Sequence, residues 1–445
     1  MQIAWRTAGM KHPLNTEPID AGALRIGMFI HLDGGWMSHP FPLSSFRISA
    51  GSQIATLQSL GLKLRWCPTQ SDPAPCAGVI AHADAARQAA SGDAPAPAPT
   101  PTPALSAAIQ ARLDHREALA HQRDAQAVCE RQFSEAAHAC KTMAETVPMR
   151  PQQAREQAEA LTRALTEKML GERDLCIRLL NEVAGDKAAA HAMNVTVISM
   201  LMGRSFGVSE SDMLDLGMGA MLHDIGKLDL PERIRHRDEN FSSSQARSYQ
   251  EHVAHGVAHG RKMGLTSGAM LVVARHHEDA DGSGFPLQLK SDSTTIAARI
   301  VALVNRYDNL CNPHIPSRAI TPHEAVSLLF AQGRDKFDPA ILGSFIKMMG
   351  VYPPGSAVQL TNGRFALVVG VNSSRPLKPR VLVHEQGVAR EDALIVDLER
   401  VAGLGIRRSI KPTSLPPDSL GYLAPKPRTA YFFEPSREAP AAAMA

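Results

Sequence analysis

The sequence predicts a mainly α-helical protein with a small β-rich domain near its N-terminal end and a β-rich extension near its C-terminal end. Long segments rich in Ala, Gln, Glu and Arg are typical of helices. Strand-like runs bounded by turn residues lie only towards the two ends of the chain. Hydrophobic residues make up 44% of the 445 residues, which is enough for a substantial core.

The β-rich N-terminal domain should span residues 14–72. Its first apolar run, LRIGMFIHL, ends at an Asp-Gly-Gly turn signal at positions 33–35, and FPLSSFRIS reads as a further strand. SQIATLQSL should be a short helix that ends at Gly61, because glycine favours the C-terminal cap of a helix. The following LKLRW reads as a strand.

A Pro/Ala-rich linker should follow at residues 73–104, since APAPAPTPTPA cannot build a core. Residues 105–182 should form a helical connector, interrupted at VPMRP because proline cannot continue a helix. These helices could transmit a signal, mediate a homodimer or contact a signalling protein. A packed connector without such a role is an equal alternative.

Residues 183–352 alternate apolar helical segments with histidines and should form a helical domain that carries the candidate functional residues. Residues 353–410 should be a β-rich extension, because Asn362-Gly363 between two apolar runs is a hairpin signal. The tail, residues 411–445, is rich in Pro and Ala and should lack fixed structure.

Charge and composition argue against several classes of partner. The net charge of +3 favours neither a nucleic acid polymer nor an anionic membrane. MQIAWRTAGMKHPL lacks the apolar core of a signal peptide, and no apolar run is long enough to span a bilayer. Six scattered cysteines without a CxxC pair read as reduced thiols. We therefore expect a cytoplasmic protein.

The segment LGMGAMLHDIGKLDLP carries the first candidate site. On a helix, the adjacent side chains of His223 and Asp224 diverge by roughly 100°, so they could hold different sides of a metal cluster. Lys227 lies three residues after Asp224 and would share its face. Metals that polarise a phosphoryl group, with a lysine that neutralises developing charge, suit hydrolysis of a phosphate ester.

HDIGK and the later HHEDADGSGFP together resemble the HD-GYP family of bacterial HD-superfamily phosphohydrolases. The resemblance spans roughly residues 186–370, and the N-terminal unit resembles a small domain often found upstream of HD-GYP domains. It implies an HD-type helical domain that hydrolyses cyclic di-GMP at a site with two or three metals. The resemblance assigns metal ligation to His191, His223, Asp224, His252, His276, His277 and Asn305, catalysis to Asp224 and Lys227, and substrate binding to Lys227, Asp308, Arg318, Gly284 and Phe285.

Several positions depart from the family pattern. Lys187 replaces a glutamate that helps some members hold a third metal, which favours two ions. Asn305 stands where the family has a ligating aspartate, so the site lacks one negative charge. HIPSR, from His314 to Arg318, replaces an R-P-Y-R/K segment that grips phosphates, and Phe285 replaces a tyrosine. Imidazole with carboxylate suits Fe, Mn or Zn.

The predicted function is metal-dependent hydrolysis of cyclic di-GMP to pGpG, GMP or both. Asn305 and His314 motivate a second hypothesis, a weak or inactive module that acts by ligand binding or protein interaction. A third hypothesis is an HD phosphohydrolase for another nucleotide, because HIPSR could mark a changed substrate.

Overall fold

The computed structural model describes residues 16–32, 45–68, 71–72, 103–171, 174–181, 186–238, 240–372 and 375–435. The chain divides into two compact units, and the boundary between them falls after Asp124, within helix α3 (Pro103–Thr146). The turn predicted at 33–35 and most of the predicted linker lie outside the described residues. Each unit is described by itself below.

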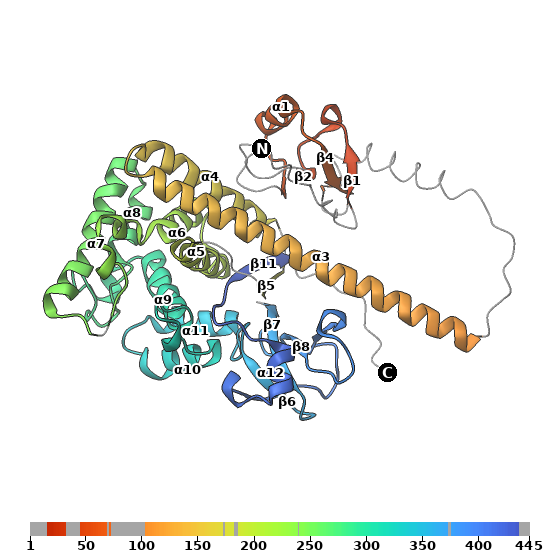
Figure 1. The fold of residues 1–445 in the computed structure, drawn as a ribbon. Coiled ribbons are helices and arrows are strands. Elements are labelled where there is room, and N and C mark those ends of the chain that lie inside the picture. The colour runs from red at the N-terminus through yellow and green to blue at the C-terminus, as the bar shows by residue number, and fades with distance from the viewer. Residues whose placement is uncertain are drawn as a thin grey trace, which may run out of the picture. The chain divides into compact units, whose positions relative to one another are not determined.

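The first unit contains a four-stranded antiparallel sheet in the order β1-β4-β2-β3 and the helix α1 (Figure 1). Trp66, Leu57 and Ile30 are completely or almost completely buried in its core. The predicted helix stop is confirmed, because Gly61 caps α1 with φ of 60° in the left-handed region. The elements are β1 (Glu17–Ile19), η1 (Ala21–Ala23), β2 (Phe29–Leu32), β3 (Ser45–Arg47), α1 (Gly51–Leu60) and β4 (Leu64–Cys67).

The second unit is mainly helical, as predicted. Side chains of Ser, Thr or Asp cap most of its longer helices at the N-terminus, where they accept backbone N–H groups. Besides the second part of α3, its helices are α4 (Pro151–Leu170), α5 (Lys187–Ser205), α6 (Glu210–Leu222), α7 (Ser243–Met263), α8 (Ser267–Arg275), α9 (Ile296–Cys311), α10 (Pro322–Gln332), α11 (Pro339–Met349) and α12 (Pro417–Leu423). Short 3-10 helices are η4 (Ile225–Asp229), η5 (Glu232–Ile234), η6 (Ser291–Ser293), η7 (Pro316–Arg318), η8 (Arg390–Asp392) and η9 (Pro412–Ser414).

An antiparallel sheet closes the second unit, in the order β10-β6-β7-β5-β11, with β8 paired to β7 and β9 paired to β8. The hairpin predicted at Asn362-Gly363 is present, because β6 and β7 pair on either side of it. The strands are β5 (Leu175–Leu179), β6 (Ala357–Leu360), β7 (Phe365–Asn372), β8 (Arg380–Val383), β9 (Ile395–Asp397), β10 (Ile406–Ser409) and β11 (Tyr431–Pro435).

Two sequence-based expectations are wrong. The second predicted connector helix ends at Leu170, and residues 175–179 form strand β5 instead, because β7 and β11 pair with it on its two sides and bury every residue. The tail is ordered as far as Pro435, because Tyr431, Phe432 and Phe433 are fully buried. Residues 436–445 lie outside the described residues.

Helix α5 packs against α6, α9 and β11 and carries a nearly continuous buried stretch from Met193 to Gly203. The N-terminal end of α5, which carries His191, therefore lies close to helices α6 and α9 and to the sheet that contains β11. Within the described ranges, no helix combines the length and the apolar character that a membrane crossing requires.

Candidate metal centre

The HD pair lies at a helix end rather than within a helix. Helix α6 ends at Leu222, His223 caps it, and Asp224 precedes η4. A Cβ atom on Gly226 would lie 2.0 Å from the carbonyl oxygen of His252 and 2.3 Å from the backbone nitrogen of Gly256. Glycine at position 226 therefore allows η4 to contact α7, which brings the HD pair next to His252.

Three buried histidines share one hydrogen-bonding arrangement. Each donates its Nδ1–H to the backbone carbonyl three residues earlier, so Nε2 carries the lone pair of the neutral ring. The bonds run from His223 to Ala220 at 2.7 Å, from His252 to Tyr249 at 2.5 Å and from His276 to Val273 at 2.9 Å. Helix ends and the α7 backbone thus fix three rings with Nε2 available as a ligand atom.

These nitrogens converge on Asp224. One group that could hold a metal ion contains Asp224, His252, His276 and His277, and a second contains His191, His223 and Asp224. Within each group, one candidate ligand atom per residue lies within 4.8 Å of all the others. Asp224 belongs to both groups: its Oδ1 lies 3.6 Å from His252 Nε2, and its Oδ2 lies 3.3 Å from His223 Nε2. Two adjoining groups of possible metal ligands therefore share one carboxylate.

Unsatisfied polar atoms support this interpretation. Four buried side-chain atoms of the two groups lack a hydrogen-bond partner of good geometry: Nε2 of His191, of His223 and of His277, and Oδ1 of Asp224. Buried polar atoms ordinarily have such partners, since an unpaired one costs about 1–3 kcal/mol. Here the unpaired atoms face one another and combine nitrogen with oxygen, so a divalent metal fits the donor set.

Burial keeps three of the histidines neutral. It lowers the pKa of His252 to about 3, and it also lowers the pKa of His223 and, strongly, that of His277. Burial opposes ionisation of Asp224, but Lys227 and His223 hold the pKa of this carboxyl well below its ordinary value. His223, His252 and His277 thus stand as neutral imidazoles around a carboxylate at neutral pH, which are the protonation states that bind metals.

Lys227 lies beside the shared carboxylate. Its Nζ is 2.5 Å from Asp224 Oδ2 and 5.4 Å from the centroid of the Tyr249 ring. Burial acts against its charge, but Asp224 raises the pKa of Lys227 above its ordinary value. A fixed positive charge therefore stands next to both metal groups, with a side chain that is 21% exposed.

The HHEDADGSGFP segment folds back on itself after α8. Both carboxylate oxygens of Glu278 accept backbone N–H groups, from Leu287 at 2.7 Å and Leu289 at 2.8 Å. The Phe285 ring stacks on His277, with 4.4 Å between centroids. Gly284 is buried, and a Cβ there would lie 2.4 Å from the carbonyl oxygen of His277. This glycine permits the close turn that carries His277, and the substrate contact at Gly284 stays a prediction.

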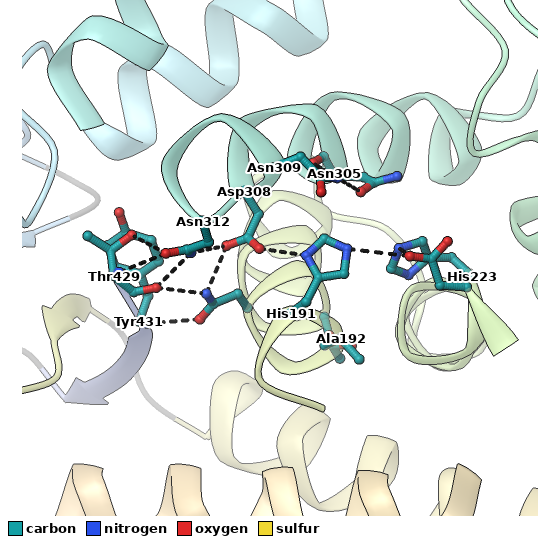
Figure 2. A network of polar contacts seen from close by, with 12 residues as sticks. His191, Ala192, His223, Asn305, Asp308, Asn309, Asn312, Thr429 and Tyr431 are labelled. Atoms are coloured by element: carbon teal, nitrogen blue, oxygen red, sulfur yellow. Dashed lines mark hydrogen bonds and ion pairs between the residues drawn. The ribbon is translucent and has the colours of Figure 1, made fainter. Parts of the chain in front are cut away.

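Asp308 also has a different role from the predicted substrate contact. It has no exposed surface, and its Oδ2 lies 2.6 Å from Nδ1 of His191 (Figure 2). A buried carboxylate that accepts the Nδ1–H of a histidine leaves Nε2 as the ligand atom. Asp308 thus orients His191 and cannot reach a substrate in solution.

Asn305 lies one helical turn before Asp308 on α9 and is 3% exposed. Its side-chain oxygen accepts a hydrogen bond from Asn309 Nδ2 at 2.6 Å, as Figure 2 shows. An oxygen already held in this way is a weaker ligand than a free carboxylate. A role for Asn305 at the metal stays a prediction.

The HIPSR segment contacts the loop after η5. His314 stacks on His236 with 3.9 Å between ring centroids, and Arg318 Nη1 lies 3.3 Å from Asp238 Oδ1. Arg318 is exposed, so contact with a substrate stays a prediction. Burial and neighbouring His314 lower the pKa of His236 to about 4. Sequence inspection did not identify His236, because it lies between the two motifs and belongs to neither.

Two family models match the chain. Residues 141–341 match the HD domain, which includes every residue of both metal groups. Residues 17–158 match a Domain of unknown function (DUF3391), which begins at the N-terminal sheet and continues into α4. The second match therefore extends well beyond the predicted boundary at residue 72.

Several curated phosphodiesterases are similar to the chain. Cyclic di-GMP phosphodiesterase PA4108 of Pseudomonas aeruginosa is 25% identical over 364 residues, which cover 81% of this chain and 83% of that protein. The 3'3'-cGAMP-specific phosphodiesterase 2 of Vibrio cholerae is 28% identical over 38% of this chain and 33% of its own length. The response regulator RpfG of Xanthomonas campestris pv. campestris, also a cyclic di-GMP phosphodiesterase, is 26% identical over 42% and 51%.

The chain thus spans most of the first relative and about half or less of the other two. The HD-domain match covers both metal groups, and the alignment with the first relative is long enough to include HDIGK and HHEDADGSGFP. Residues 141–341 thus carry an HD domain, and the chain is similar to curated cyclic di-GMP phosphodiesterases, as the resemblance implies.

Proposed function

We propose that this chain hydrolyses a phosphodiester bond of a cyclic dinucleotide, with cyclic di-GMP as the substrate and pGpG, GMP or both as products. The observation that carries the proposal is the pair of metal groups that share Asp224, with unpaired Nε2 atoms directed between them. The names of the similar curated proteins support the substrate class.

The mixed imidazole and carboxylate donors suit two ions of Fe, Mn or Zn. When bound, such ions supply positive charge that polarises a phosphoryl oxygen and acidifies water. His252, His276 and His277 would hold one ion, His191 and His223 the other, and Asp224 both. Lys187 is exposed at the first position of α5 and brings a positive charge, which supports two ions rather than three.

The chain itself would contribute two things to the reaction: metal ligands held in fixed positions and the positive charge of Lys227. Lys227 is held by Asp224 beside both groups, where its ammonium can neutralise charge that develops on a phosphate. The HHEDADGSGFP turn fixes His277 through Phe285 and Glu278, so the ligand geometry is set before substrate binds.

The experiment uses the purified full chain. Elemental analysis would give metals per chain, and turnover of cyclic di-GMP would be followed by chromatography with added Mn²⁺ or Fe²⁺, with 3'3'-cGAMP in parallel. Asp224→Ala should abolish turnover, whereas His259→Ala should not, because His259 pairs with Asp229 outside both metal groups. Chelation should remove activity, and Mn²⁺ should restore it. A folded wild-type chain with less than one metal and no turnover would refute the proposal.

Asn305 favours a second candidate function. The resemblance implies that related enzymes have a charged carboxylate at this position. This chain has an amide instead, and the amide oxygen already accepts a hydrogen bond from Asn309. A weakened centre could serve as a cyclic dinucleotide-binding or protein-interaction module. Tight binding of cyclic di-GMP without turnover, in protein that contains its metals, would favour this candidate.

A further inference from the structure

A buried hydrogen-bond network links the proposed metal centre to the C-terminal strand (Figure 2). Asp308 stands in the middle of this network. Its Oδ2 accepts the Nδ1–H of His191, and its Oδ1 accepts two amide N–H groups, from Asn194 on α5 and Asn312 at the end of α9, both at 2.8 Å. Three donors, two on α5 and one at the end of α9, therefore set the orientation of one carboxylate.

The same two asparagines bind the backbone around β11. Their Nδ2 atoms both donate to the carbonyl oxygen of Thr429, at 3.0 Å from Asn194 and 2.8 Å from Asn312. In the reverse direction, Asn312 Oδ1 accepts the N–H of Thr429 at 2.8 Å, and Asn194 Oδ1 accepts the N–H of Tyr431 at 3.1 Å. Each amide thus holds Asp308 on one side and the strand on the other.

Strand β11 is anchored independently of Asp308. It pairs with β5, and Arg178 Nη2 lies 2.5 Å from Glu434 Oε1, with side chains only 8% and 12% exposed. The ammonium of Lys168 lies 4.5 Å and 4.6 Å from the ring centroids of Phe432 and Phe433. The backbone that binds the two asparagines is therefore a fixed reference within the second unit.

We infer that Asn194, Asn312 and the backbone of residues 429–431 are positioning groups for the metal centre. They hold Asp308, which holds His191 so that its Nε2 faces Asp224 Oδ2 at 3.7 Å. Without the strand, Asn194 and Asn312 would lose their backbone partners, so neither amide would have a fixed direction toward Asp308, and the support of the His191 ring would weaken. This inference rests on the proposed function, since it concerns the same metal centre.

The test compares two full-length variants. Asn312→Ala removes one donor to Asp308 and the side-chain hydrogen bonds of Asn312 with Thr429. Tyr431→Phe is the matched control: it removes hydroxyl contacts of the same strand with Tyr307 and Pro354 but keeps the backbone bond to Asn194. Mn²⁺ affinity, measured by electron paramagnetic resonance, should weaken roughly 10- to 100-fold in Asn312→Ala and change less than about twofold in Tyr431→Phe. Equal affinity in Asn312→Ala and wild type would overturn the inference.

A second readout needs no metal. In ¹⁵N-histidine NMR of the metal-free protein, the ring resonances of His191 are assigned by their loss in His191→Gln. They should shift in Asn312→Ala and stay in place in Tyr431→Phe, while melting curves show that both variants fold. If the wild-type chain binds no Mn²⁺, the proposed function fails, and the NMR comparison still decides the positioning role. Unchanged His191 resonances in folded Asn312→Ala would overturn it.

Discussion

Replacement of Asp308 by Asn should invert the tautomer of His191. In the native protein, Oδ1 of Asp308 accepts two N–H groups from Asn194 and Asn312, while Oδ2 accepts the Nδ1–H of His191. In Asp308→Asn, the amide oxygen must face the two asparagine donors, so the amide N–H group faces the ring. The ring must then accept at Nδ1 and carry its proton on Nε2, where it can no longer bind a metal.

The size of the effect follows from the bond that is lost. A hydrogen bond to a charged group contributes about 1.5–3 kcal/mol. At about 1.4 kcal/mol per factor of ten, this corresponds to roughly 10- to 150-fold in an equilibrium constant. Loss of a carboxylate that orients a ligating histidine typically costs about 10- to 100-fold in metal affinity. We therefore expect the Mn²⁺ dissociation constant of Asp308→Asn to rise by about one to two orders of magnitude.

The assay is a Mn²⁺ titration with ¹⁵N-histidine NMR of the metal-free protein. Asp229→Asn is the control, because Asp229 Oδ2 lies 2.9 Å from His259 Nε2 in a histidine–carboxylate pair that belongs to neither metal group. It should leave Mn²⁺ affinity unchanged. The reasoning fails if Asp308→Asn folds, binds Mn²⁺ like the wild type and keeps the proton of His191 on Nδ1.

Asn305→Asp should strengthen Mn²⁺ binding and raise turnover by adding a carboxylate charge; a metal titration that shows no gain would count against a ligand role for this position. Gly226→Ala should lower the free energy of unfolding, measured in urea, by about 1–3 kcal/mol, because its Cβ would collide with the backbone of α7. Gly343→Ala is the control. Its Cβ would meet no atom within 4 Å, so this change should raise the free energy of unfolding by about 0.5–1 kcal/mol. For the metal-free protein, the lowered pKa of His252 means that the unfolded chain binds more protons than the folded one between about pH 3 and its ordinary pKa of 6.5. The free energy of unfolding should therefore fall as the pH drops through this range. Urea titrations at several pH values should show a weaker pH dependence for His252→Gln than for the wild type, and equal pH dependence would contradict this expectation.

Local sequence signals were sufficient for the fold class and for most residues that meet at the centre. HDIGK and HHEDADGSGFP place His223 and His276 at helix ends, where each Nδ1–H reaches a carbonyl three residues back. Such a contact joins residues only three positions apart, so a short sequence motif can contain both partners. The glycines at 226 and 284 are part of the same local patterns, although only the structure shows which backbone each one approaches.

The remainder of the centre depends on contacts between distant segments, which no local pattern encodes. Asp308 could not be assigned correctly, because its partners come from α5 and from backbone around β11. Strand β5 was taken for helix, because it acquires its strand pairing only from β7 and β11. The run Tyr431-Phe432-Phe433 was a usable signal for a buried strand, but the surrounding Pro and Ala content obscured it.

The C-terminal strand sets an order of events during synthesis of the chain. Thr429 follows Asn312 by 117 residues, so the ribosome must add all of them after α9 before Asn312 can bind its backbone partner. A nascent chain released before this point would contain every histidine of both metal groups and still lack the backbone groups that hold Asn194 and Asn312. Residues 429–431 thus separate a chain with this support from a shorter one that has the same motifs.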